Sequence, residues 1–83
     1  MMTGIVELDL HGLTPGEAQK KIDRALEAAD RSVYTLRLIH GYHGGTSLRA
    51  MIREEYSWCR HSKVLRIRSG DNPGITELVL REL

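Results

Sequence analysis

Asp9 and His11 are the first pair of side chains in this 83-residue sequence whose types and spacing suit acid–base chemistry. An imidazole exchanges protons near neutral pH, and a neighbouring carboxylate can orient the ring or stabilise its charge. Both residues fall at the end of an alternating apolar–polar run, so they would point the same way from a strand. Side chains two apart on a strand are separated by about 6–7 Å, so the pattern does not require a direct bond between them.

A glycine-rich segment from His40 to Thr46 is the second candidate. Glycines let the backbone approach a ligand closely, and the free N–H groups at the start of a following helix suit an anion. The spacing matches neither the P-loop nor the dinucleotide fingerprint. Two interpretations stay open, a phosphate-binding loop and a tight connection that needs glycine for steric reasons. Tyr42 is the aromatic residue best placed here to stack on a base.

Basic side chains are concentrated in the middle of the chain. Residues 31–70 carry eight basic and two acidic side chains, although the whole chain has a net charge of only +1. Arg37, Arg66 and Arg68 alternate with apolar residues, so they should share the polar sheet face with Asp9 and His11. Guanidinium groups suit phosphate oxygens, which permits a polyanionic partner without demanding one. The simpler interpretation is a solvated face with cross-strand pairs between arginines and carboxylates.

The periodicity of apolar residues predicts the elements that position these groups. Strands are expected at 5–10, 33–40, 64–68 and 75–81, and helices at 15–29 and 47–60. Thr14 and Glu17 form a capping-box pattern at the start of the first helix. Tyr56 is expected at the margin of the second helix's buried stripe, and Leu65 is expected to face inward.

This order, β-α-β-α-β-β, predicts an α/β fold. Strand–helix–strand crossovers give parallel neighbours, and alternating strands indicate that helices cover only one face of the sheet. We therefore expect a two-layer sandwich, with a four-stranded mixed sheet and two helices on one face, as one domain over residues 1–83. The last strand could lie at an edge or between two others.

Composition narrows the cellular context. No apolar run approaches the roughly 18 residues of a membrane span, and the first residues do not form a signal peptide. One cysteine among 83 residues allows no internal disulfide. These features predict a cytoplasmic protein without a membrane partner.

Three motifs together resemble the small MutS-related (Smr) domain family. They are LDLHG at residues 8–12, the segment from His40 to Arg49, and NPGIT at residues 72–76. The resemblance covers nearly the whole chain. It implies a fold similar to the C-terminal domain of translation initiation factor three, nucleic-acid binding and, in several members, endonuclease activity. Some members nick DNA, and others cleave messenger RNA on stalled ribosomes.

The resemblance also implies roles for individual residues. The family's D-x-H pair matches Asp9 and His11, and its glycine loop matches Gly41, Gly44 and Gly45. The nearest match to the family's basic residue after that loop is Arg49. The loop here is one residue longer than usual, and His43 stands where glycine is common. This departure leaves open whether the extra imidazole belongs to an active subfamily or to one that only binds.

The leading hypothesis is phosphodiester cleavage, with His11 as acid or base, Asp9 as its partner, His43 as a second acid or base, and Arg49 stabilising charge. The expected nucleic-acid contacts are Arg37, Gly41, Tyr42, Gly44, Gly45, Thr46, Arg66 and Arg68. The partner is DNA or RNA, with the ribosome as a further candidate, and the oligomeric state stays open. RNA needs no metal because its 2′-hydroxyl can attack, whereas DNA makes a divalent metal at Asp9 more attractive. No metal ligand is assigned, and a zinc site of His11, His40 and His43 lacks cysteine partners.

Two other classes compete with this hypothesis. One is a non-catalytic module that binds nucleic acid or the ribosome through Arg37, Arg66 and Arg68. The other is a small-molecule phosphate enzyme that uses the glycine loop, for which 83 residues leave little room.

Overall fold

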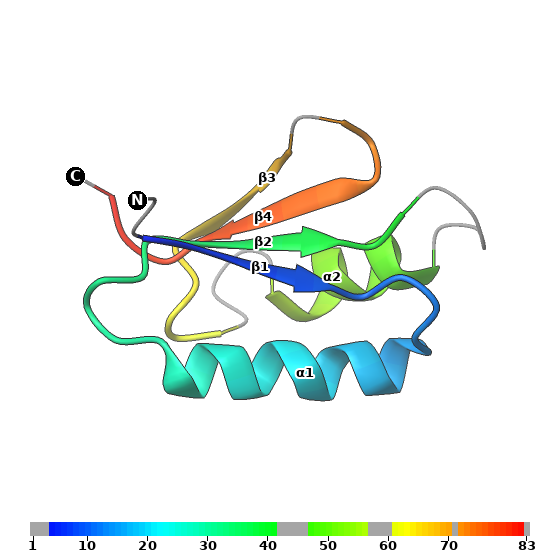
Figure 1. Cartoon of the computed structure of the whole chain (residues 1–83), viewed down its shortest axis with the longest axis horizontal. Helices are drawn as coiled ribbons and strands as arrows, with labels where there is room; N and C mark the ends of the chain where they lie inside the picture. The colour runs from blue at the N-terminus through cyan, green and yellow to red at the C-terminus, as the bar shows by residue number, and fades with distance from the viewer. Residues whose placement is uncertain (1–3, 42–46, 57–60, 71, 83) are drawn as a thin grey trace.

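The computed structural model describes residues 4–41, 47–56, 61–70 and 72–82. They form a four-stranded sheet and two helices in the order β-α-β-α-β-β, which confirms the predicted fold class. Both helices lie on the same side of the sheet (Figure 1). The elements are β1 (Ile5–Asp9), α1 (Pro15–Ala28), β2 (Thr35–Ile39), α2 (Ser47–Tyr56), β3 (Arg66–Ser69) and β4 (Ile75–Val79).

The strand order is β1-β2-β4-β3, so the last strand along the chain lies inside the sheet. β1 and β2 are parallel, and β4 is antiparallel to both β2 and β3. Burial agrees with this order, because four of the five residues of β4 are buried while three of the four residues of β3 are exposed. The alternation of β3 alone did not distinguish an edge strand from an inner one.

The core lies between the sheet and the helices. Leu36 and Leu38 of β2 are fully buried beside Leu78 of β4, and they face Ile22 and the other apolar residues of the helices. Arg37 lies on the opposite face, as the period-two pattern predicted. The open face of the sheet is therefore polar.

The predicted capping box begins α1. The Thr14 hydroxyl accepts a hydrogen bond from the main-chain N–H of Glu17 at 3.2 Å, and the Glu17 carboxylate accepts one from the main-chain N–H of Thr14 at 2.9 Å. These contacts satisfy two N–H groups that a helix start would otherwise leave unpaired. They fix the place where the chain turns from the end of β1 into α1.

Two predictions about individual residues were wrong. Tyr56 was expected at the margin of α2 but is only 1% exposed, and its hydroxyl donates to the Asp23 carboxylate at 2.6 Å. A phenol can be buried because its one polar group finds this partner. Leu65 was expected to face inward but is 58% exposed. It precedes β3 and lines an open pocket, while Val64 takes the buried position. The last predicted turn of the second helix, 57–60, lies outside the described residues.

Candidate functional site

Described residues from each of the three sequence motifs meet at one end of the sheet. Parallel pairing places Asp9 opposite Ile39, and antiparallel pairing places Ile75 opposite the same Ile39. Beyond these pairs, the main-chain N–H groups of His40 and Gly41 both donate to the carbonyl of Gly74, at 2.9 and 3.0 Å. The C-terminal ends of β1 and β2 therefore adjoin the start of β4. Such strand ends are where α/β sheets commonly bind ligands.

The side chains of Asp9 and His11 are hydrogen-bonded to each other. The Nδ1 of His11 lies 2.5 Å from Oδ1 of Asp9, and the main-chain N–H of His11 donates to the same oxygen at 3.2 Å. β1 ends at Asp9, so His11 lies beyond the strand, where the chain turns back onto the carboxylate. The pair is well exposed, with 57% of the Asp9 side chain and 71% of the His11 side chain accessible.

This contact defines what each atom of the pair can do. The hydrogen bond from the His11 ring lowers the pKa of Asp9, and the bond from the His11 main chain lowers it further. Asp9 is then an anion at neutral pH and accepts the proton of Nδ1. In that tautomer Nε2 is the ring atom able to take a proton from another molecule. The geometry is that of a general base held by a carboxylate.

Gly41 lies directly beside this pair. It has φ +81°, a left-handed conformation that glycine adopts without steric cost, and a Cβ added there would lie 3.6 Å from the His11 Cβ. The adjacent His40 is 5% exposed, and its Nε2 lies 2.8 Å from the Thr76 hydroxyl. Burial lowers the pKa of His40, against the opposite effect of its hydrogen bond to the Gly41 carbonyl. His40 is therefore a buried residue, and its contact with Thr76 ties the end of β2 to β4.

Lys21 also contacts this pair, which the sequence did not reveal. Its Nζ donates to the main-chain carbonyl of Asp9 at 3.0 Å, and its positive charge helps to lower the Asp9 pKa. Its side chain is exposed, like those of other charged residues of α1. Its only distinguishing signal was its position next to the buried Ile22, at the edge of the apolar stripe.

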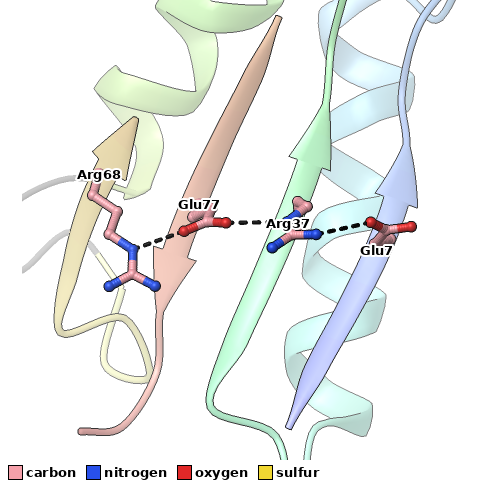
Figure 2. Close-up of polar contacts among 4 residues, drawn as sticks. All are labelled: Glu7, Arg37, Arg68 and Glu77. Atoms are coloured by element: carbon pink, nitrogen blue, oxygen red, sulfur yellow. Dashed lines mark hydrogen bonds and ion pairs between the residues drawn. The ribbon is translucent and has the colours of Figure 1, made fainter. Parts of the chain in front are cut away.

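The predicted cationic face is internally neutralised. Arg37 donates to Glu7 at 3.1 Å and to Glu77 at 3.0 Å, and Arg68 donates to the other oxygen of Glu77 at 2.7 Å. These four side chains form a row of alternating charge across all four strands (Figure 2), which we call the charge ladder. Arg66 is likewise paired, with Glu82 at 2.8 Å. The structure therefore shows the paired alternative for all three arginines that were predicted to contact nucleic acid.

Glu77 holds the ladder together. Only 9% of its side chain is exposed. Burial alone would raise its pKa, but the hydrogen bonds from Arg68 and Arg37 outweigh that effect and the pKa is lowered. A buried carboxylate with two guanidinium partners is a structural anion. Glu77 already balances the charge of Arg37 and Arg68, which weakens their attraction for a phosphate.

The remaining expected site residues are placed only in part. Arg49 is exposed in α2, and its charge is close enough to His40 to help lower the pKa of that ring, so it lies toward the same end of the sheet. Tyr42, His43, Gly44, Gly45 and Thr46 fall outside the described residues. Within the described ranges, no three histidine, cysteine, aspartate or glutamate side chains gather as metal ligands. Nor does that part of the chain contain a helix long and apolar enough to cross a membrane.

Comparisons with known proteins agree with the motifs. The family description "Smr domain" matches residues 8–74 of this chain. Among solved structures, the chain is similar to the Smr domain of Thermus thermophilus MutS2, with 38% sequence identity and a TM-score of 0.78. That match covers 93% of this chain and 99% of the other. A comparison with curated proteins found no significant match.

Proposed function

Because the chain belongs to the Smr domain family, whose members are nucleic-acid-binding, nuclease-like domains, we propose that it is an endonuclease acting at the Asp9–His11 pair. The observation that carries the proposal is that the Asp9 carboxylate and the His11 imidazole are hydrogen-bonded and exposed at the end of the sheet. A buried pair would only stabilise the fold. An exposed pair beside Gly41 and Lys21 is accessible to a phosphodiester.

RNA is the substrate that these groups suit best. In the proposed step, Nε2 of His11 takes the proton of a 2′-hydroxyl, whose oxygen attacks the adjacent phosphorus while the bond from phosphorus to the 5′-oxygen breaks. The products are a 2′,3′-cyclic phosphate and a 5′-hydroxyl, the latter protonated by water or by the second imidazole expected at His43. Asp9 orients the ring and stabilises its positive charge. Lys21 and Arg49 would neutralise charge on the non-bridging oxygens.

The described residues suit DNA cleavage less well than RNA cleavage. Attack by water at a phosphodiester is commonly assisted by a divalent metal held by several oxygen ligands. Asp9 supplies one carboxylate, and the described residues place no group of three ligands around it. The proposal therefore routes no step through a metal. Ribosome-bound RNA and a cytoplasmic location are part of the same proposal.

The test is cleavage of single-stranded and structured RNA, with supercoiled DNA in parallel, each with and without chelator. We expect His11→Ala and Asp9→Ala to reduce RNA cleavage by at least ~10²-fold, the contribution typical of a positioned acid–base group. Asp30→Ala is the matched control, because the Asp30 carboxylate makes a similar contact with Ser32, two residues ahead, at the other end of the molecule. It should cut as the wild type does. Undiminished cutting by both site variants would refute the assignment.

Binding without cleavage is the second candidate function. The lengthened glycine loop, with His43 in place of glycine, is the observation that favours it. In that case the wild type yields no cyclic phosphate ends, and His11→Ala binds RNA as tightly as the wild type. A steep fall of affinity with salt would then identify phosphate contacts.

A further inference from the structure

An open pocket lies at the end of the sheet opposite Asp9 and His11. Its volume is about 320 Å³. Its walls come from the segments that follow α1, precede β2 and β3, and follow β4, all of which lie at the left of Figure 1. We propose that this distal pocket binds an acidic segment of a partner protein that carries an aliphatic side chain. The proposal is independent of the endonuclease function.

The apolar part of the pocket is incompletely covered. Leu65 is 58% exposed, and Val6 at 37% is the only other large hydrophobic residue that is exposed within the described ranges. Val33 and Leu80 lie beside it in the pocket and are partly buried against the core. Removing the exposed part of a leucine side chain from water is favourable. An aliphatic side chain placed against Leu65 would recover part of that free energy.

The charged part of the pocket is cationic. Among the described residues of its lining, Arg31, Lys63 and Arg81 are basic and Asp30 is the single acid. The Asp30 carboxylate already accepts two hydrogen bonds from Ser32, at 2.8 Å from its N–H and 2.6 Å from its hydroxyl. The Nζ of Lys63 donates to the Leu26 carbonyl at 2.6 Å, so this ammonium already has one partner. A ligand would therefore meet an excess of positive charge around an aliphatic floor.

This combination fits a peptide better than a nucleic acid. Single-stranded nucleic acids are held by aromatic side chains on which bases stack, as well as by positive charge. The described residues that line the pocket include no aromatic ring. Carboxylates can pair with Arg31 and Arg81 while a leucine or isoleucine contacts Leu65 and Leu80. Charge complementarity of this kind gives specificity and a faster association rate.

The experiment titrates the isotopically labelled full chain with a blocked peptide that has two leucines between runs of glutamate. Methyl and amide NMR shifts report where it binds. We expect saturable changes at Val33, Leu65 and Leu80. A peptide with serines in place of the leucines, or lysines in place of the glutamates, should bind at least ~5-fold more weakly.

Variants distinguish peptide binding at the pocket from nonspecific attraction to surface charge. Leu65→Ser and Arg81→Glu should each weaken the peptide at least ~5-fold without altering the thermal midpoint, because both side chains are exposed. Arg24→Glu changes an exposed arginine outside the pocket and should leave binding within ~2-fold. Three results would overturn the proposal: no saturable shifts at the pocket, equal binding of the serine peptide, or displacement of the peptide by oligouridylate from these same residues.

Discussion

The bond between Asp9 and His11 depends on where β1 stops. Two residues within a regular strand would stand about 6–7 Å apart. Here the last strand residue is Asp9, and the main-chain N–H of His11 turns back to donate to its carboxylate. That turn brings the ring within hydrogen-bond distance. The residue types indicated the chemistry, and the local end of the strand brought the two groups together.

The titration of Asp9 tests this contact directly. His11→Ala removes the ring that is the main cause of the lowered Asp9 pKa. We expect the pKa of Asp9 to rise toward its ordinary value of about 3.9, as measured by carboxyl-detected NMR. Asp30, whose pKa is lowered by Ser32, should keep its value in the same variant. An unchanged Asp9 pKa would mean that the ring does not hold the carboxylate in solution.

Lys21 provides a prediction about substrate binding. Its ammonium lies at the Asp9 carbonyl, whereas its neighbour Lys20 is exposed one position away on α1. Lys21→Ala should lower the affinity for single-stranded RNA and reduce the slope of log K against log salt by about 1, the effect of losing one phosphate contact. Lys20→Ala should leave the slope unchanged. Fluorescence anisotropy over a salt series measures both, and identical slopes for the two variants would exclude Lys21 from the site.

At the scale of the elements, the charge ladder depends on strand register. Arg37 pairs across the sheet with Glu7 on one side and Glu77 on the other, and Arg68 lies opposite Glu77. A slip of one residue in any strand would move its ladder member to the apolar face. The ladder therefore favours a single register as well as neutralising the open face.

Removing the central carboxylate should destabilise the sheet. Glu77→Gln leaves Arg37 and Arg68 without their buried anion, at a cost of about 2 kcal/mol, or on the order of 10 °C in Tm for a domain of this size. Glu7→Gln alters the exposed end of the same ladder and should shift Tm by no more than about 2 °C. Thermal unfolding followed by circular dichroism compares the two. Equal shifts in Tm would show that the burial of Glu77 does not increase its contribution to stability.

At the scale of the whole molecule, the fold rearranges the charge that the sequence concentrates in residues 31–70. Arg37, Arg66 and Arg68 of that segment are paired with acids from β1, β4 and the residues after β4. The basic segment therefore does not become a basic sheet face. Other positive charge lies at the two ends of the sheet, at Lys21 beside Asp9 and in the distal pocket.

Acid should lower the stability of the protein over two separate pH ranges. Burial lowers the pKa of His40, so the unfolded chain binds a proton there first, and stability begins to fall below about pH 6.5. The lowered pKa values of Asp9, Asp30 and Glu77 mean that the folded state binds fewer protons than the unfolded state, so further stability is lost as the pH falls through about 4. Tm measured from pH 7 to pH 3 should show both slopes, and Glu77→Gln should flatten the second. A Tm independent of pH would contradict these assignments.

The sequence alone determined the elements, the helix-covered face and the first two members of the candidate site. Those features follow from periodicities of two and 3.6 residues, from the cap at Thr14, and from the short distance between Asp9 and His11 along the chain. Tertiary structure decided the position of β4, the pairing of Arg37 with Glu77, the contact of Lys21 with Asp9 and the exposure of Leu65. Each of these depends on which distant segment becomes a neighbour and in which register. A local pattern does not specify these neighbours. The same alternation suits an edge strand or an inner strand, and it suits an arginine that is paired or one that is exposed.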